Sequence, residues 1–249
     1  QALGARPPSS FTTLAGLSVR AGPEILAPAQ LAASVVTALA RDFSAPATTE
    51  WAATLEQSVA RAGGVQVSYV GAAGRRLLFS ESVDWPGQLL TVATNRGSSD
   101  YHALQAQARL RARRFHALAS FAWTHSTDNV SQDSRPVRES LASGRHANSD
   151  FDVRLSASAE LVFRLPLAWT FSAIYRARTG FPIDVLTNRA TRPDLVFGEP
   201  VWRRDGAAPG GRALNPDAFR DSGAGADGSL GRNAIPGLGM SQADLSLAR

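Results

Sequence analysis

Apolar and polar residues alternate along residues 149–180, with apolar side chains on every second position on both sides of Pro166. This period of two is typical of β-strands that have one apolar and one polar face. The pattern predicts two long antiparallel strands, over 153–165 and 169–179, joined by a very short turn. The apolar face is formed by Val153, Leu155, Ala157, Ala159, Leu161, Phe163 and Leu165, then by Trp169, Phe171, Ala173, Tyr175 and Ala177.

The same alternation returns elsewhere in the chain and predicts further strands. A hairpin is expected from residues 50–60 and 65–71, with the glycine-containing turn 61–64 between them. A longer pair is expected from 101–114 and 116–126, and shorter strands are expected at 75–83, 181–187 and 240–249. Residues 1–50 contain few strand signals, and 27–43 fit either a short amphipathic helix or an irregular loop.

The expected connections alternate between short and long. Short turns are predicted near 61–64, 113–116 and 165–168, and long polar loops at 73–100, 127–151 and 188–239. Outer-membrane barrels have short periplasmic turns and long outside loops, and ordinary domains rarely contain several long structureless loops. Strands over 101–112, 117–125, 153–165 and 169–179 also reach the 9–11 residues that a tilted strand needs to cross hydrocarbon.

The polar face of these strands carries arginine and glutamate, which a sandwich core could not hold unpaired but a polar lumen could. We therefore predict an all-β fold, an antiparallel meander of long amphipathic strands that forms an incomplete part of a transmembrane β-barrel. The aromatic residues near strand ends fit either membrane-interface belts or a soluble core: Trp51, Tyr69, Tyr101, Trp123, Trp169 and Tyr175.

Composition narrows the class further. The 249 residues have no cysteine, which excludes disulfides and thiolate chemistry, and no apolar run long enough for a transmembrane helix. The net charge is +5 and every one of the 26 basic residues is arginine, which is weak evidence for a nucleic-acid partner. The chain starts with Gln1 and lacks a signal peptide, so we expect a fragment of a longer protein.

Several phrases resemble the C-terminal barrel of TonB-dependent outer-membrane receptors, specifically the Oar-like subgroup that often carries a carboxypeptidase-regulatory-like domain. The resemblance covers residues 49–249 and is carried by the order of phrases such as "TEWAATLEQSVARAGGVQVSYVGAAGRRLL", "SSDYHALQAQARLRARRFHALASFAWTHSTDN", "SDFDVRLSASAELVFRLP", "RTGFPIDV", "RPDLV", "LNPDAF" and "GSLGRNAIPGLGMSQADLSLAR".

This resemblance implies a 22-stranded barrel with a plug domain, located in the outer membrane of a Gram-negative bacterium, that imports a small ligand with energy from a TonB complex. We expect residues 1–48 to be a loop-rich or weakly helical lead-in and 49–249 to be a truncated barrel without the plug, which should not transport anything as it stands. The expected partners are the lipid bilayer, the plug and TonB complex of the full-length parent, and an unknown small ligand, with no nucleic acid.

Side chains of the types that catalyse reactions or bind metals do not form a recognisable site in the sequence. The four histidines, His102, His116, His125 and His146, lack metal-ligand spacing. Ser126 and Asp128 next to His125 lack a nucleophile elbow. We therefore predict no catalytic, cofactor-binding or metal-binding residues, no cofactor, and no enzymatic activity.

Two charged clusters have structural explanations. The arginines Arg109, Arg111, Arg113 and Arg114 fit a lumen lining or a charged rim at a periplasmic turn. Asp150 and Asp152 fit a turn from a loop into a strand. Any ligand is expected to bind through the outer loops 127–151 and 188–239, with no individual residue assigned.

A second hypothesis stays open at this point. A secreted, soluble β-rich binding or adhesin module would show the same alternation if it packed two apolar sheet faces together.

Overall fold

The structure is a computed structural model, and it describes residues 11–14, 17–20, 36–40, 43–59, 63–85, 88–131, 137–138, 146–188, 191–223 and 228–249. The chain divides into two compact units. The first contains 1–49, 73–100 and 128–146, and the second contains 50–72, 101–127 and 147–249. The described residues contain no α-helix, and none of their helical segments is long and apolar enough to cross a membrane.

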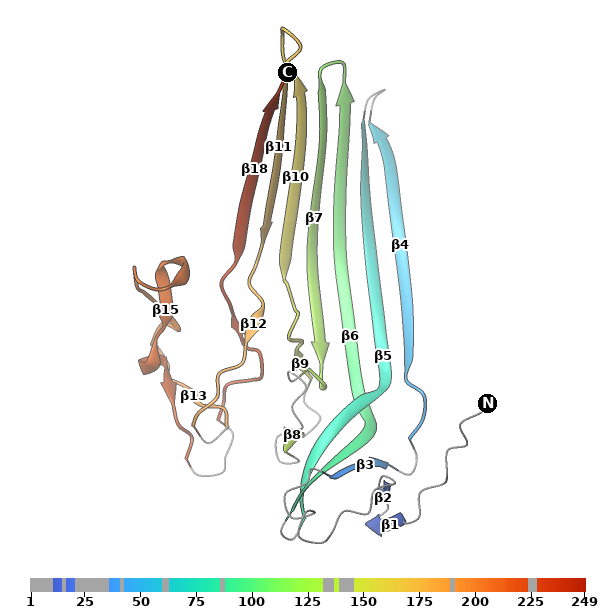
Figure 1. Cartoon of the computed structure of the whole chain (residues 1–249), viewed down its shortest axis with the longest axis vertical. Helices are drawn as coiled ribbons and strands as arrows, with labels where there is room; N and C mark the ends of the chain where they lie inside the picture. The colour runs from blue at the N-terminus through green and yellow to red at the C-terminus, as the bar shows by residue number, and fades with distance from the viewer. Residues whose placement is uncertain are drawn as a thin grey trace, which may run out of the picture. The chain divides into compact units, whose positions relative to one another are not determined.

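The second unit is an antiparallel meander of long strands in the order β4, β5, β6, β7, β10, β11, β18 (Figure 1). These strands are β4 Ala47–Val59, β5 Gly63–Trp85, β6 Gln88–Ala112, β7 Phe115–Asp128, β10 Leu155–Arg164, β11 Thr170–Arg178 and β18 Met240–Ala248, of which β5 and β6 also continue through residues of the first unit. Among the described strands β4 pairs with β5 alone and β18 with β11 alone, so the sheet is open. The predicted all-β meander is therefore confirmed.

The register places the apolar positions of four neighbouring strands in the same rows. Leu161 is opposite Ala117 and Ala173, and Ala173 is opposite Leu245. The row that contains Phe163 continues through Phe115, Phe171 and Leu247. Because a shift of one residue would move every side chain to the other face, this alignment fixes one apolar face and one polar face.

Large apolar side chains stay exposed on the apolar face, and Leu245 is 71% accessible and Trp123 57%. We call this surface the outer face. Soluble monomers rarely expose a contiguous apolar patch of this extent, which is the pattern of a surface that meets lipid or a partner. Its other exposed members include Leu55, Val65, Val67, Leu104, Leu110, Phe121, Leu155, Phe163, Tyr175 and Leu247.

An aromatic cluster lies on the outer face at the end of the strands away from the short turns. Tyr69 Oη and His102 Nδ1 are 2.8 Å apart, and the Trp51 ring lies edge-on to His102 with 6.2 Å between ring centroids. Gly71 lies beneath the Trp51 ring, since a β-carbon at this position would overlap the indole. A glycine inside a strand thus gives the indole room to lie against the backbone.

The turn between β10 and β11 has an uncommon backbone. Trp169 N–H donates to the Pro166 carbonyl at 3.4 Å, and both central residues have positive φ, 60° for Leu167 and 63° for Ala168. Paired positive φ values define a type I′ turn, which suits the right-handed twist of two flanking strands. Asn-Gly is the usual sequence for this turn, so Leu-Ala adopts it at a cost in backbone strain.

The first unit contains more β-structure than the sequence predicted. β1 Phe11–Leu14 pairs with β2 Leu17–Arg20, and β2 pairs with β3 Val36–Ala40, although residues 1–50 have few strand signals. Residues 36–40 therefore do not form the helix considered for 27–43, and 27–35 lie outside the described residues. β8 Val137–Arg138 pairs in parallel with β5.

The prediction of a long polar loop at 73–100 is wrong. β5 continues to Trp85, which absorbs the short strand expected at 75–83, and β6 already begins at Gln88. In the first unit, Phe79 and Val92 are buried, and Thr94 donates its hydroxyl to the Phe79 carbonyl at 3.3 Å. The two strands have 23 and 25 residues, more than the crossing of a bilayer requires. Apolar and polar residues therefore need not alternate over their whole length.

Short paired segments, rather than one structureless loop, form much of residues 181–236. β12 Pro182–Ile183 pairs with β17 Ile235–Pro236, β13 Asp194–Leu195 with β16 Phe219–Arg220, and β14 Trp202–Arg204 with β15 Arg212–Leu214. Single 3₁₀ turns occur at Pro209–Gly211 and Pro216–Ala218. Only 182–183 of the strand expected at 181–187 is formed. In the segment 127–151, β7 extends to Asp128 and β9 is Ala147–Asn148.

Candidate ligand site on the polar face of the sheet

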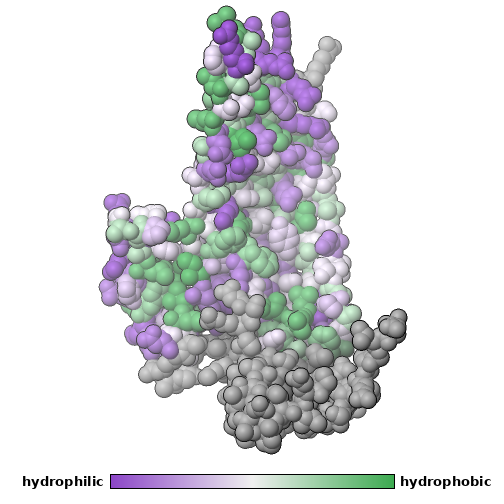
Figure 2. Space-filling model, in the orientation of Figure 1, coloured by the Kyte–Doolittle hydropathy of each residue, from purple (hydrophilic) through white to green (hydrophobic). Residues whose placement is uncertain are grey.

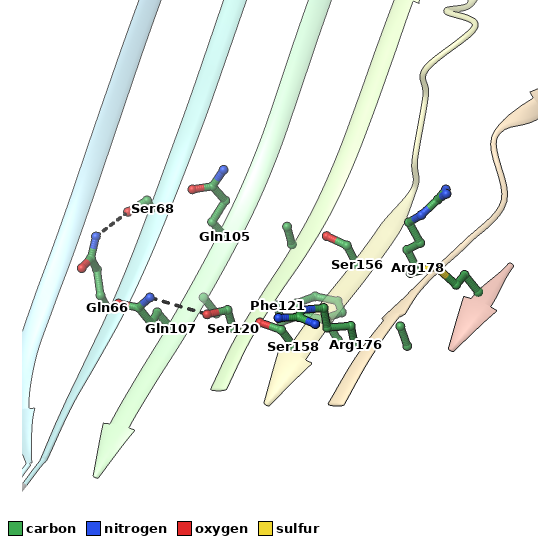
Figure 3. Close-up of a pocket in the computed structure, with 15 residues that line it drawn as sticks. Gln66, Ser68, Gln105, Gln107, Ser120, Phe121, Ser156, Ser158, Arg176 and Arg178 are labelled. Atoms are coloured by element: carbon green, nitrogen blue, oxygen red, sulfur yellow. Dashed lines mark hydrogen bonds between the residues drawn. The ribbon is translucent and has the colours of Figure 1, made fainter. Parts of the chain in front are cut away.

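The polar face of the second unit carries a hollow of about 430 Å³ (Figure 3). It is lined from β5, β6, β7, β10 and β11 by amide, hydroxyl and guanidinium groups. Alternation along each strand brings these side chains to one face, where the register sets Ser158 opposite both Ser120 and Arg176. The polar lining residues are Gln66, Ser68, Gln105, Gln107, Ser120, Ser156, Ser158, Arg176 and Arg178.

Hydrogen bonds hold part of this lining in place. Gln66 Nε2 donates to Ser68 Oγ at 3.3 Å, and the Ser68 hydroxyl lies 2.9 Å from Thr54 Oγ1. Gln107 Nε2 is 3.5 Å from Ser120 Oγ on the next strand. The lining therefore offers both donors and acceptors to a polar solute.

Two arginines of β11 supply the positive charge of the hollow. Arg176 Nη1 lies 3.5 Å from the Asp244 carboxylate on β18, so part of its charge is balanced. The Arg178 guanidinium lies 4.3 Å from the centre of the Phe181 ring, a cation–π arrangement that leaves its N–H groups available in the plane.

A second hollow of about 490 Å³ borders the first and shares Ser156 and Arg178 with it. Its further lining comes from the loop region, including Trp202 and Arg212, whose guanidinium is 5.5 Å from the indole. An indole face beside guanidinium and hydroxyl groups is suited to a polar ligand that has one apolar side.

Ion pairs and backbone hydrogen bonds fix the loop region that borders the second hollow. The Arg192 guanidinium binds the Asp184 carboxylate through two N–H groups, at 3.1 Å and 3.0 Å. Asn215 is buried and donates to the Pro200 carbonyl at 3.0 Å. Gly180 permits a close approach of the Gly237 backbone that a β-carbon would block. These contacts give the segment a defined shape despite its loop-like composition.

The pKa of Asp194 is lowered from its ordinary value of 3.8, chiefly by the backbone N–H of Ser229. This N–H donates to Asp194 Oδ1 at 2.7 Å, and the Ser229 hydroxyl and the Arg220 charge add to the effect. Because the folded state lowers this pKa, the stabilisation is complete above the unfolded-state pKa and is lost as the pH falls through the folded one.

We therefore expect the Asp194 carboxyl carbon to titrate below pH 3.8 in ¹³C NMR, with Asp194→Asn used to assign the signal. Ser229→Ala removes the hydroxyl but keeps the N–H, so it should raise the pKa only part of the way back. A midpoint at or above 3.8 in the wild-type protein would contradict the hydrogen bonds described here.

The four histidines lie in four different surroundings. His102 contacts Tyr69, His116 lines a hollow at the short turn between β6 and β7, and His125 Nδ1 lies 3.5 Å from Asp152 Oδ2. His146 Nε2 lies 2.8 Å from the Ser98 hydroxyl. Within the part of the chain that the structure describes, no group of three or more His, Cys, Asp or Glu side chains is arranged to hold a metal.

Ser126, Asp128 and His125 each have separate partners. Ser126 Oγ lies 2.9 Å from Ser149 Oγ, and the Asp128 carboxylate accepts from the backbone N–H groups of Val130 and Ser131 at 3.0 Å and 2.8 Å. These contacts close local turns, and the structure does not bring the three side chains together as a nucleophile, base and acid.

Asp152 is a buried carboxylate with three partners in the second unit. Its oxygens accept from the Ser126 N–H at 2.8 Å and from Arg154 Nε at 2.6 Å, and His125 is the third neighbour. Its own N–H donates to the Ser149 carbonyl at 3.0 Å, and Asp150 accepts from Asn233 at 2.6 Å. The two aspartates thus organise the turn into β10.

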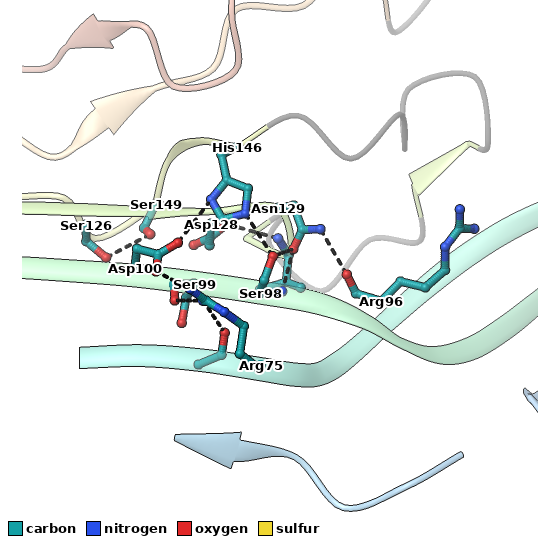
Figure 4. Close-up of polar contacts among 12 residues, drawn as sticks. Arg75, Arg96, Ser98, Ser99, Asp100, Ser126, Asp128, Asn129, His146 and Ser149 are labelled. Carbon is teal, nitrogen blue, oxygen red and sulfur yellow. Dashed lines mark hydrogen bonds and ion pairs between the residues drawn. The ribbon is translucent and has the colours of Figure 1, made fainter. Parts of the chain in front are cut away.

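A polar network ties β5 and β6 together in the first unit (Figure 4). Arg75 Nη2 binds Asp100 Oδ1 at 2.7 Å, and His146 Nδ1 lies 3.7 Å from the other carboxylate oxygen. The Asn129 side chain accepts from the Ser98 N–H at 2.7 Å and donates to the Arg96 carbonyl at 3.0 Å. Ser98 and Asp100 lie in the segment expected to be a loop, and Arg75 begins the short strand expected at 75–83, so no signal in the sequence marks these three residues as a cluster.

The structure separates the four arginines near the β6–β7 turn. Arg109 pairs with Glu56 on β4, Nη2 to Oε1, at 2.8 Å. Arg111, Arg113 and Arg114 line a hollow at the turn instead. The alternation of β6 predicted the shared face of Arg109 and Arg111. Trp202 and Arg212, in contrast, lie on strands of three residues that leave no periodic signal.

An open meander of long strands, with an apolar outer face that is exposed and a polar face on the other side, is typical of the wall of a membrane β-barrel. The chain belongs to the family of outer membrane beta barrel domains, whose family model matches residues 3–249. It is accordingly a protein of the bacterial outer membrane. This membership supports a lipid-facing outer face over the packed core of a soluble adhesin module.

Comparisons with individual proteins add little to the family match. None of the curated proteins matches the sequence. A solved structure that resembles the chain is the outer membrane transporter YddB from Escherichia coli, with a TM-score of 0.48 and 18% identity over 63% of this chain. The chain spans 24% of the length of that transporter structure.

Proposed function

We propose that this chain forms part of the barrel wall of a TonB-dependent receptor of the Oar-like subgroup, which imports a small ligand across the outer membrane. In this proposal residues 49–249 are the barrel portion, residues 1–48 are a lead-in, and a plug domain and the TonB complex are partners. The sequence phrases that resemble this receptor family, together with the barrel family of the chain, support the proposal.

The observation that carries the proposal is the pair of adjoining hollows on the polar face and the loop region. A wall that only lined a passive pore would need polar side chains, but not a Trp202–Arg212 platform beside the shared residues Ser156 and Arg178. The groups present are those that bind a polar solute with hydroxyl or carboxylate groups. Arg178 is the residue we expect to contact such a solute, because it lines both hollows.

The test is solute uptake by the source bacterium with and without this protein. Mass spectrometry of the medium should identify a solute that wild-type cells deplete and a deletion strain does not. Depletion should stop when a protonophore collapses the inner-membrane gradient or when TonB is absent. A guanidinium–ligand hydrogen bond is worth about 1.5–3 kcal/mol, so Arg178→Ala should lower uptake about tenfold or more at low solute concentration.

Arg203→Ala is the matched control, because Arg203 is an exposed arginine of the same loop region that lines neither hollow. It should leave uptake unchanged. Uptake that continues without TonB or a gradient would refute energy-coupled import and would indicate a passive channel. Equal losses for Arg178→Ala and Arg203→Ala would refute the assignment of the site.

A further inference from the structure

A third hollow, of about 410 Å³, lies at the turn between β6 and β7 and is strongly basic. Its wall comes from the end of β6, the two turn residues, the start of β7 and the end of β10. Figure 2 shows hydrophilic side chains gathered at this end of the strands. We call the hollow the arginine pocket, and its lining contains Arg111, Arg113, Arg114, His116 and Arg164.

The arginines of this pocket lack the acidic partners that other arginines of the sheet have. Arg109, two residues before Arg111 on the same strand, binds Glu56 at 2.8 Å, and Arg176 has Asp244 at 3.5 Å. No carboxylate lines the arginine pocket. Among the described residues, Arg111, Arg113, Arg114 and Arg164 make no ion pair and no side-chain hydrogen bond.

Four guanidinium groups around one hollow repel each other, and the repulsion is stronger where water is excluded. The backbone brings them together regardless, since Arg164 N–H donates to the Arg114 carbonyl at 2.8 Å. An anion in the hollow would remove this repulsion. Planar guanidinium forks bind phosphate oxygens through two parallel hydrogen bonds, so a phosphate group matches these side chains.

The position of the pocket indicates where such a phosphate is found. Short turns of outer-membrane barrels face the periplasm. Phe115, which also lines the pocket, lies opposite Phe163 in an apolar row of the outer face, and the pair Leu165 and Trp169 lies one row further toward the turn. The pocket therefore lies at the level of the lipid headgroups of the periplasmic leaflet, where phosphate esters are present both in phospholipids and in soluble periplasmic solutes.

We propose that the arginine pocket is a binding site for a phosphate ester on the periplasmic side of the outer membrane. Arg111 and Arg164 hold the phosphate from the polar face, and Arg113 and Arg114 hold it from the turn. This site depends on the barrel family of the chain but not on energy-coupled import. The uptake experiment above can therefore fail without affecting it.

The test compares binding to the wild-type full chain with binding to the Arg111→Gln/Arg164→Gln double variant, both folded in uncharged detergent micelles. Isothermal titration calorimetry with inorganic phosphate measures a soluble anion. Native mass spectrometry after addition of phosphatidylglycerol or phosphatidylcholine measures retained lipid. Arg109→Gln is the matched control, since it removes one arginine of the same strand that already has an acidic partner.

We expect the wild-type protein to bind inorganic phosphate or to retain phosphatidylglycerol in preference to phosphatidylcholine, in a manner that salt weakens. The double variant should lose at least tenfold in affinity, and Arg109→Gln less than twofold. Retention of phosphatidylglycerol without binding of inorganic phosphate supports a lipid headgroup, and binding of both supports access for soluble phosphate esters.

Three results would overturn the proposal. The first is no binding of either probe by a wild-type protein that shows the circular dichroism of a β-sheet in the same micelles. The second is an equal loss of binding in Arg109→Gln. The third is selective binding of a polyglutamate peptide, which would make the pocket a contact for an acidic protein segment.

Discussion

Replacement of Ala159 by arginine should destabilise the folded protein in a bilayer by about 2–4 kcal/mol, the usual cost of a cationic side chain on the lipid face near the midplane. Ala159 lies halfway along β10, between Ala119 and Tyr175 on the outer face. Unfolding by urea in phosphatidylcholine vesicles, followed by tryptophan fluorescence, measures the change.

The matched variant is Ser158→Arg, one residue away on the same strand. Ser158 lies between Ser120 and Arg176 on the polar face, so the new guanidinium meets water and polar groups rather than lipid. We expect a change below about 1 kcal/mol for this variant. If Ser158→Arg were as costly as Ala159→Arg, or if Ala159→Arg had no effect, the assignment of the two faces would be wrong.

Loss of the Asp152 carboxylate should also be costly, at about 3 kcal/mol for Asp152→Ala, because the change leaves the buried Ser126 N–H without its acceptor and Arg154 Nε without its ion pair. Only 2% of the Asp152 side chain is exposed, although it accepts from Ser126 and Arg154. Urea unfolding again measures the stability, and hydrogen exchange of the Ser126 amide reports on the site itself.

Two further variants separate the roles of this carboxylate. Asp152→Asn keeps an oxygen for the Ser126 N–H but loses the charge that pairs with Arg154, so it should cost about half as much. Asp217→Ala, at an exposed position of the 3₁₀ turn Pro216–Ala218, should change stability by less than about 0.5 kcal/mol. A cost for Asp152→Ala as small as that for Asp217→Ala would contradict a structural role for the buried carboxylate.

The alternation in the sequence predicted the strands where the membrane restricts the side chains. β10 and β11 were placed to within two residues, and the register confirms that Leu161 and Ala173 share a face with Leu245. A strand that crosses lipid must be apolar on one side and pair all its backbone groups, so its periodicity is visible without a structure.

Prediction failed in residues 73–100 and 181–236, which lack a regular alternation of apolar and polar residues. β5 and β6 continue as strands through residues such as Gly74, Arg75 and Asn95, because their backbones pair with each other and neither face has to be apolar. The two-residue and three-residue strands around Trp202 depend on contacts between residues far apart in the chain. Their sequences contain no period long enough to detect.

The candidate site was predictable to a similar degree. The polar face of β10, with Ser156 and Ser158, follows from the alternation, and the arginines near 113 were expected either to line the lumen or to form a charged rim at a periplasmic turn. That Arg164 joins them, and that Arg178 lies between two hollows, depends on the register between strands. Register is a property of several strands together and cannot be obtained from one strand alone.

The strained turn at Leu167 and Ala168 affects the order in which the hairpin of β10 and β11 forms. Two left-handed residues without glycine cost about 1–2 kcal/mol each, so the turn does not form on its own in the unfolded chain. The nine residue pairs between β10 and β11 must provide the free energy that holds it. We infer that β10 and β11 first pair at their ends away from the turn, or first pair with a neighbouring strand, and that the turn forms last.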